Sequence, residues 1–319
     1  MARTPPRPAD LSTPLKVAFA GTPDFAATIL HALTSSPHEV GLVISQPDPR
    51  RGRGRKTTPT PVAELARHHG LLLEQPARIS ELTGELSGFD ALVVAAYGQI
   101  LRQDTIYATR EGAYNVHASL LPKYRGAAPV ERAIMNGETQ TGITIMKMDA
   151  GLDTGPMALQ RSVSIPPEMN AGELSELLAN TGAKAMAESL DLLEGDRLTL
   201  VEQDSLNATY ASKLTDEDRV IRWGRAAGEV HDRVRALAPR VGARTHHPDV
   251  KGPIKIWRSR VANTVPSPSD AGYIRTESGR MVVSCGSGSL EVLELQTPGG
   301  RRLPAREFLL GRPLEGAFD

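Results

Sequence analysis

The sequence predicts two domains of different class, an α/β domain followed by a small β-barrel. Three observations indicate this. The chain has 319 residues, which suits two domains of roughly 100–200 residues each. Its first part alternates short apolar runs with helical periodicity, whereas its last part holds short strand-like runs separated by Gly, Ser and Pro. With 40% hydrophobic residues and no apolar run near the ~18 residues that cross a bilayer, the sequence is typical of a soluble globular protein.

The predicted first domain opens with an apolar run, Leu15–Ala20, followed by a tight turn and by helical spacing of apolar residues over Asp24–Ser36. The same alternation continues through the domain. Strands are predicted at Val40–Ser45, Ala91–Ala96, Ala113–His117, Thr141–Met148 and Met157–Ile165, and helices at Thr60–His69 and Ala171–Leu193. Apolar strands with helices between them indicate a mostly parallel sheet covered on both faces, which binds ligands at the carboxyl ends of its strands.

The remaining boundaries follow from composition. Residues 1–14 hold Pro and Arg but no apolar stretch, so we expect a disordered tail rather than a secretory signal. The first domain is predicted to span residues 15–195, a linker without periodicity residues 196–212, and the second domain residues 213–319. The second domain is expected to contain a helix at Ala226–Ala238 and short strands at Ile254–Val261, Gly272–Thr276, Met281–Ser284 and Leu290–Gln296.

Cysteine content and charge narrow the class of protein further. The single cysteine, Cys285, excludes an internal disulfide framework and a cysteine-cluster metal site, which fits the reducing cytoplasm. We expect it to be a half-buried strand residue. From Lys213 onward the chain has 18 Lys and Arg but only 13 Asp and Glu. The part before Lys213 has 19 Lys and Arg and 24 Asp and Glu. A basic second domain suggests a polyanion as partner, although surface charge often serves only solubility.

Two polar side chains stand two residues apart at the end of a predicted strand. Alternation along the strand puts Asn115 and His117 on one face, so their side chains can converge on one point. An amide and an imidazolium can both donate hydrogen bonds to the oxyanion of a tetrahedral intermediate formed at a carbonyl carbon. For an isolated Asn-x-His pattern, a structural Asn and a surface His would be the more common explanation.

Two loops follow predicted strands at the same edge of the sheet. Ser119–Gly126 is an apolar pair that ends in Pro and leads into cations, and its exposed backbone suits a flat heterocycle or, alternatively, a hydrophobic staple between strand and helix. Asp149–Gly155 offers two carboxylates, and one beside His117 would favour the imidazolium by Coulomb attraction. The residues alone leave open whether Asp149 or Asp153 points inward, and a turn-forming role is the common alternative.

A cationic loop lies between the first two predicted strand–helix units. Gln46–Pro61 packs five cations into seven positions, with glycines between them: Arg50, Arg51, Arg53, Arg55 and Lys56. A long loop of this kind inside a compact domain is usually functional, and phosphate contacts are the obvious use. We expect it to order on its ligand, with a merely solvated basic loop as the alternative. By contrast, the turn Ala20–Phe25 has one glycine and a proline, so it implies no dinucleotide.

These segments combine into one pattern: AGTPDF, the QPD loop ending in PTPV, VVAAYGQIL, NVHASLLPKYRGAAP, TGITIMKMDAGLDTG and IKIW. The pattern resembles the methionyl-tRNA formyltransferases, a family that takes its formyl group from 10-formyltetrahydrofolate. The resemblance runs over nearly the whole chain from Lys16 and is densest at Asn115–Pro129 and Thr141–Gly155. It departs at Ala238–Val241, where the family often has a stretch rich in Pro and aromatic residues.

The resemblance implies a Rossmann-like first domain, a second domain of the oligonucleotide-binding (OB) type and a catalytic trio of Asn115, His117 and Asp153. It implies that the cationic loop enters the acceptor arm of initiator methionyl-tRNA. The folate contacts that it implies are Ser119, Leu120, Leu121 and Pro122 together with Tyr97, Gly98, Gln99, Ile100 and Leu101. The implied reaction is direct transfer from N10 of the folate to the α-amino group of the methionyl ester. We expect a monomeric cytoplasmic enzyme without a metal. His246 and His247 are predicted to be surface residues, since no partners at metal-ligand spacing accompany them.

Two rival functions use parts of the same pattern. A formyltransferase that acts on glycinamide ribonucleotide or an amino sugar would use the same trio, but such a small substrate needs neither the cationic loop nor a basic second domain. A noncatalytic RNA-binding module would be expected to lose the convergent Asn, His and Asp. The sequence therefore favours tRNA formylation over both.

Overall fold

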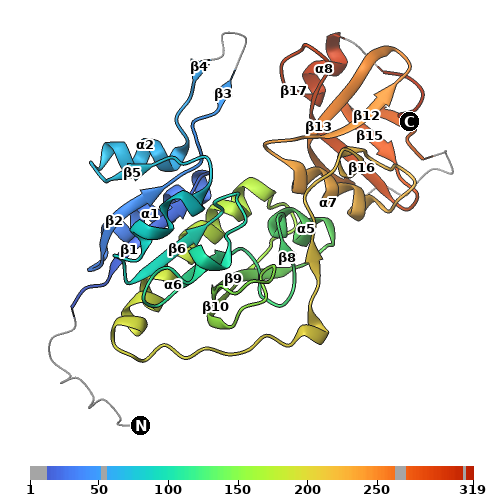
Figure 1. Ribbon diagram of the computed structural model, residues 1–319. Helices are drawn as coiled ribbons and strands as arrows, with labels where there is room; N and C mark the ends of the chain where they lie inside the picture. Colours follow the sequence, from blue (N-terminus) through green and yellow to red (C-terminus); the bar gives the residue numbers. More distant parts are fainter. Residues whose placement is uncertain (1–12, 52–55, 263–270, 312–313) are drawn as a thin grey trace. The chain divides into compact units, whose positions relative to one another are not determined.

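The computed structural model describes residues 13–51, 56–262, 271–311 and 314–319. The described residues within Met1–Arg125, Gly142–Ser162 and Glu176–Thr209 belong to one compact unit, and those within Gly126–Thr141, Val163–Ser175 and Tyr210–Asp319 belong to a second (Figure 1). The predicted disordered tail lies almost wholly outside the described residues. Within the described part of the chain, no helix has the length and apolar character that a membrane span requires.

Seven strands form the sheet of the first domain, in the order β10-β9-β7-β6-β1-β2-β5. Their bounds are β1 Lys16–Gly21, β2 Glu39–Ile44, β5 Leu73–Glu74, β6 Ala91–Ala95, β7 Ala113–His117, β9 Gln140–Lys147 and β10 Met157–Ser164. The pairs β1–β2, β1–β6, β2–β5 and β6–β7 are parallel, and β7–β9 is antiparallel. The predicted α/β fold with a mostly parallel sheet is therefore confirmed.

Helices follow the strands of this sheet. They are α1 Asp24–Thr34, α2 Pro61–His68, α3 Thr83–Leu86, α4 Gln103–Ile106, α5 Pro129–Met135 and α6 Ala171–Glu194, with a 3-10 turn, η1, at Ile79–Leu82. The start of α2 is fixed locally, because the Thr60 hydroxyl accepts from the Ala63 amide at 3.1 Å and Pro61 occupies the first helical turn. Sequence periodicity predicted α1, α2 and α6 but not the short helices.

The two faces of the sheet are covered by different elements, and this decides where the polar strand residues point. On one face Ala18, Leu92 and Val94 join a core with η1, α3 and α4. Asn115 pairs in parallel register with Val94, so it lies on this same face of the sheet. Val116 faces the opposite side, where Gly182 of α6 comes so close that a Cβ there would lie 2.7 Å from the Val116 methyl.

The cationic loop contains two short strands, β3 Arg50–Arg51 and β4 Lys56–Thr57, which pair antiparallel near α2 (Figure 1). Their base is held by Asp48, whose carboxylate accepts from the Thr60 amide at 3.1 Å and from Arg67 Nη2 at 3.0 Å. Burial tends to raise the pKa of the Asp48 carboxyl, but the hydrogen bonds from Gln75, Arg67 and Thr60 outweigh it and lower the pKa. Arg53 and Arg55 lie outside the described residues.

The second domain is an antiparallel β structure, as predicted. Its sheet runs β12-β13-β16-β15-β14, with β17 paired to β16. The bounds are β12 Ala243–His247, β13 Val250–Ala262, β14 Ile274–Glu277, β15 Arg280–Ser284, β16 Ser289–Gln296 and β17 Leu303–Pro304, with helices α7 Ala227–Leu237 and α8 Ala305–Gly311. Residues from β12 to β16 and from both helices form one apolar core.

Two residue-level predictions for this domain were wrong. His247 is 3% exposed rather than on the surface, because its ring packs edge-on against Phe318 and donates from Nε2 to the Glu315 carbonyl at 2.9 Å. Cys285 follows β15 and is 6% exposed, not a half-buried strand residue. Burial raises the pKa of the Cys285 thiol to about 11, so this cysteine is a poor nucleophile at neutral pH.

Candidate active site

Asn115 and His117 lie at the carboxyl end of β7, between the parallel strand β6 and the antiparallel strand β9. Their separation by two residues puts both side chains on one face, as predicted. His117 is 5% exposed, whereas Asn115 is half-buried. Within the described residues the side-chain amide of Asn115 has no hydrogen-bond partner, so its two N–H donors are available to a ligand.

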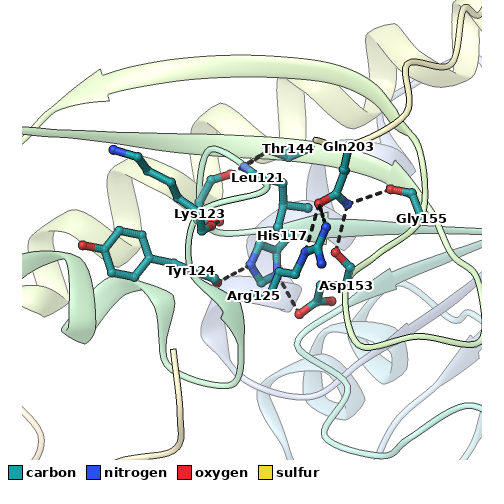
Figure 2. A network of polar contacts seen from close by, with 10 residues as sticks. His117, Leu121, Lys123, Tyr124, Arg125, Thr144, Asp153, Gly155 and Gln203 are labelled. Atoms are coloured by element: carbon teal, nitrogen blue, oxygen red, sulfur yellow. Dashed lines mark hydrogen bonds and ion pairs between the residues drawn. The ribbon is translucent and has the colours of Figure 1, made fainter. Parts of the chain in front are cut away.

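The His117 ring is held between two oxygen atoms from different loops (Figure 2). Nε2 donates to the carbonyl oxygen of Tyr124 at 2.9 Å, and because a carbonyl only accepts, Nε2 carries a proton. Nδ1 faces Oδ2 of Asp153 at 3.6 Å, an ion-pair distance that is longer than a hydrogen bond. Since both ring nitrogens face acceptors, the site can accommodate the imidazolium form.

The two aspartates in the loop after β9 make different contacts. Asp149 accepts from the Gly151 amide at 3.0 Å and from the Thr154 hydroxyl at 2.7 Å, so it shapes the turn. Asp153 instead turns its carboxylate toward His117. Its backbone has φ +53°, in the left-handed region that Asp tolerates better than most residues. The geometry thus distinguishes two aspartates that the residue pattern alone did not.

The loop that contains Ser119, Leu120, Leu121 and Pro122 is fixed by hydrogen bonds to its own backbone. Thr144 of β9 donates to the Ser119 carbonyl at 2.7 Å and accepts from the Leu121 amide at 3.0 Å. Ser119 is fully buried and Leu121 is 3% exposed, whereas Leu120 and Pro122 are half-buried. The two half-buried residues are therefore the members of this set that a ligand can reach most readily.

The Tyr97–Leu101 segment divides between core and cavity. The Tyr97 side chain is 2% exposed within the core, its hydroxyl has no partner among the described residues, and burial with the nearby Glu81 charge raises its pKa to about 12. The Gln99 amide bonds the backbone of Ile79 and Ala77. A cavity of about 480 Å³ lies beside the end of this segment. It is lined by Ile100, which is 94% exposed, and by Leu101, Arg102, Gln103, Asp104 and Ala150.

Comparison with known proteins identifies the family. A family model described as formyl transferase matches residues 15–190, and one described as formyl transferase, C-terminal domain, matches residues 213–313. A methionyl-tRNA formyltransferase of Rubrobacter xylanophilus is 63% identical over 95% of this chain and 99% of its own. The chain belongs to the methionyl-tRNA formyltransferase family. Another member, from Syntrophomonas wolfei, is 43% identical over 93% of this chain and 96% of its own.

A solved structure shows that the fold extends beyond this family. The N-formyltransferase of Helicobacter canadensis, in complex with folinic acid and dTDP-3-aminofucose, superposes with a TM-score of 0.66. It covers 87% of this chain and 98% of its own length at 18% identity. At that identity the likeness establishes a shared fold and leaves the acceptor of this family member to other arguments.

Two residues beside the trio were missed by sequence analysis. Arg125 belongs to the segment NVHASLLPKYRGAAP, but the sequence analysis assigned it no function. Gln203 lies in the predicted linker, where no periodicity marks a functional side chain. Arg125 is 3% exposed and donates through Nε and Nη2 to Gln203 Oε1 at 3.1 and 2.8 Å. Figure 2 shows both side chains next to His117 and Asp153.

One cluster of potential metal ligands occurs among the described residues, formed by His38, Asp191 and Glu194. Nδ1 of His38 accepts from the Leu15 amide at 3.3 Å, so the neutral ring carries its proton on Nε2, which donates to Asp191 at 3.1 Å. Binding a cation through Nε2 would require the loss of that proton while Nδ1 still accepts. The cluster is therefore a hydrogen-bonded tie between the start of β2 and α6.

Proposed function

We propose that this chain transfers the formyl group of 10-formyltetrahydrofolate to the α-amino group of methionine on initiator methionyl-tRNA, giving N-formylmethionyl-tRNA. The observation that carries the proposal is the placement of His117, which lies beside Asn115 at the carboxyl end of β7 with the Asp153 carboxylate 3.6 Å from its ring. Ligands bind at this end of the strands in open α/β sheets.

Asn115 and His117 would act on the oxygen of the formyl group. The donor supplies an electrophilic formyl carbon, and attack by the amine places negative charge on the formyl oxygen. The Asn115 amide has its donors available, and Nδ1 of His117 is not committed to a hydrogen bond at 3.6 Å from Asp153. The Asn115 amide can therefore donate to the developing oxyanion, and Nδ1 of His117 can donate to it when the ring is an imidazolium. Stabilisation of the oxyanion is usually the largest single catalytic effect in acyl transfer.

Asp153 would act through charge and proton transfer. Its carboxylate lies 3.6 Å from Nδ1 of His117, and it can receive a proton from the attacking amine and pass it toward the leaving nitrogen. The ammonium of the methionyl ester loses two protons as the amide forms. One goes to solvent before the attack, and the other would pass through Asp153 to N10 as the bond between N10 and the formyl carbon breaks. Only Asp153 of the two loop aspartates faces His117, since Asp149 is occupied by the turn.

We expect the folate to bind in the cavity that Ile100 and Leu101 help to line. The cavity next to Ile100 and Leu101 combines apolar side chains with Gln103 and Asp104, and a few polar groups in an apolar lining suit a heterocycle with ring nitrogens. Leu120 and Pro122 would cover the ligand from the neighbouring loop. We expect these residues to orient the donor so that its formyl group reaches Asn115 and His117.

The choice of a tRNA as acceptor rests on charge. The β3–β4 hairpin and the loop between its strands concentrate Arg50, Arg51, Arg53, Arg55 and Lys56 in seven positions, and the chain from Lys213 onward is also basic. An acceptor stem carries a charge on every phosphate and uses both features. The hairpin would bind this stem while the methionyl end reaches the trio.

The direct test offers the enzyme and 10-formyltetrahydrofolate with four acceptors in turn: charged initiator tRNA, charged elongator methionyl-tRNA, glycinamide ribonucleotide and an amino-sugar nucleotide. We expect the initiator tRNA to be formylated with the highest kcat/KM. Preferential use of either small acceptor would overturn the proposed acceptor, because the trio by itself is compatible with all of them.

A further inference from the structure

The segment after α6, predicted as a linker, is anchored to the first unit by two of its residues, Val201 and Thr209. Val201 and Met157 exchange two backbone hydrogen bonds, at 2.8 and 2.9 Å. Thr209 donates from its amide to the Pro122 carbonyl at 3.2 Å, and its own carbonyl accepts from the Arg125 amide at 2.8 Å. Between these two anchors lies Gln203. The position of its side chain is therefore set from both ends.

The Gln203 amide uses all of its hydrogen-bonding capacity at the active site (Figure 2). Its Nε2 donates to the carbonyls of Asp153 at 2.9 Å and of Gly155 at 2.7 Å. Its Oε1 accepts twice from the guanidinium of Arg125. Only this orientation of the amide satisfies both sets of partners, because carbonyls cannot donate and a guanidinium cannot accept.

Two features of the partners make this contact costly to lose. Asp153 has φ +53°, a left-handed conformation that Asp tolerates better than most residues but that still costs free energy, which the contacts around the loop must offset. Arg125 is a buried cation with no carboxylate partner among the described residues. Its Nε and Nη2 donate to Oε1 of Gln203, and without this oxygen they would lose the hydrogen bonds that offset their burial. One neutral amide thus supports both a strained loop and a buried charge.

The other anchor of the segment acts on the opposite side of the His117 ring. The Thr209 hydroxyl accepts from the Tyr124 amide at 2.9 Å, and the Tyr124 carbonyl accepts from Nε2 of His117. Gln203 and Thr209 therefore hold the two loops between which His117 lies. The distance between the His117 ring and the Asp153 carboxylate depends on both contacts.

We propose that Gln203 is a positioning residue for the formyl transfer, acting by fixing the Asp153–Gly155 backbone against Arg125. This inference rests on the proposed function of the trio. Gln203 touches neither donor nor acceptor in the reaction that we propose. Its removal lets the Asp153 carboxylate leave its place beside His117, and a displacement of about 1 Å in such a group can lower turnover by about 10²-fold.

Two substitutions separate positioning from general stability. Gln203→Met keeps the length of the side chain and loses both its donor and its acceptor. Gln203→Glu still accepts from Arg125, now as an ion pair, but a carboxylate cannot donate to the two carbonyls and repels them. We expect Gln203→Glu to unfold near the wild-type temperature and yet to lose about 10²-fold in kcat, as Gln203→Met does. The KM values for folate and tRNA should stay within about threefold of wild type.

A matched control is Gln296→Met in the second unit, where the Gln296 amide accepts from Trp257 at 3.1 Å and donates to the Gly300 carbonyl at 2.8 Å. It should lower the unfolding temperature without changing kcat. Turnover of both Gln203 variants within twofold of wild type would overturn the inference.

Amide hydrogen exchange in the peptide 149–157 tests the contact independently of catalysis. Exchange is expected to rise in both Gln203 variants and to stay unchanged in Gln296→Met. If the wild-type enzyme formylated no methionyl-tRNA, the proposed function would fail and the exchange data would still decide whether Gln203 holds the loop. Unchanged exchange in both variants would contradict the contact itself.

Discussion

At the scale of single residues, the position of Asp153 depends on the small residue two places after it. Gly155 lies against the backbone of β9, and a Cβ built there would approach the Lys147 carbonyl oxygen to 1.9 Å. Backbone atoms of a buried strand cannot give way as a flexible side chain can. The tight packing of Gly155 and the hydrogen bonds of Gln203 therefore act together on the same loop.

Replacing Gly155 by Ala should displace this loop and lower kcat by about 10²-fold, because the Asp153 carboxylate moves with it. Steady-state kinetics with charged initiator tRNA measure the effect. Gly84→Ala in α3 is the matched control, since a Cβ at Gly84 meets nothing within 4 Å and its kinetics should equal those of wild type. Unchanged kcat in Gly155→Ala would show that the loop can shift without consequence for the reaction.

The trio illustrates what a sequence can reveal at this scale. Alternation along a strand was enough to put Asn115 and His117 on one face, because a strand has a period of two. It could not distinguish Asp149 from Asp153, since both stand in a turn and only the fold shows which carboxylate is bonded within that turn. Gln203 carried no signal, because its partners are backbone carbonyls and an arginine 78 positions away.

At the scale of elements, α5 packs against α7 in the second unit although it precedes β9 in the chain. Arg132 of α5 forms a bidentate pair with Asp218, with both N–O distances at 2.7 Å and both side chains less than one-fifth exposed. The hydrogen bonds from Arg132 are the main reason that the pKa of Asp218 falls from 3.8 to about 2. The pair therefore stabilises the unit only while Asp218 is ionised.

Arg132→Met should lower the free energy of unfolding by about 1.5–3 kcal/mol at pH 7, the range for a hydrogen bond to a charged group. A lowered folded-state pKa contributes stability above the unfolded pKa, which is lost as the pH falls through the folded one. The difference between wild type and Arg132→Met should therefore be largest above about pH 4 and shrink toward pH 2. Urea unfolding at several pH values measures it.

The control for this element is Arg161→Met, which removes a pair with Glu188 whose side chains are 44% and 47% exposed. An exposed ion pair is worth about 0–1 kcal/mol, so this variant should change stability little. A loss in Arg132→Met that did not vary between pH 7 and pH 2 would contradict the role given to the charge of Asp218.

Elements with a strong apolar period were predicted closely, and those without one were missed. The strands β1, β2, β6, β7 and β9 and the helices α1, α2 and α6 lie within two residues of their predicted bounds. The strand β12 has the sequence ARTHH, in which buried Ala243, Thr245 and His247 alternate with more exposed residues. The alternation exists, but two of its three inward residues are polar, so no hydrophobic pattern marks the strand.

At the scale of the whole molecule, the net charge of zero hides an uneven distribution of charge along the sequence. The proposed chemistry needs only three side chains, whereas the proposed acceptor is a polyanion that needs many cations. The hairpin arginines and the excess of basic residues after Lys213 provide them. The account therefore predicts that binding and chemistry can be weakened separately.

Replacing Arg51, Arg53 and Arg55 together by Ala should raise the KM for charged tRNA and flatten its dependence on salt, while single-turnover chemistry at saturating tRNA changes little. Each lost phosphate contact lowers the slope of log K against log salt by about 1. Binding measured at several salt concentrations tests this, with Lys184→Ala as a control for the loss of a cation elsewhere. An unchanged slope would remove the hairpin from the tRNA interface.

The central claim, that Asn115, His117 and Asp153 transfer the formyl group, is tested most directly by single-turnover formylation of charged initiator tRNA. Asn115→Ala and His117→Ala should each lower the rate of transfer by at least about 10²–10³-fold, the usual loss for one oxyanion donor, while the Kd for tRNA stays within about threefold of wild type. A rate close to that of wild type in either variant would contradict the assignment of the active site.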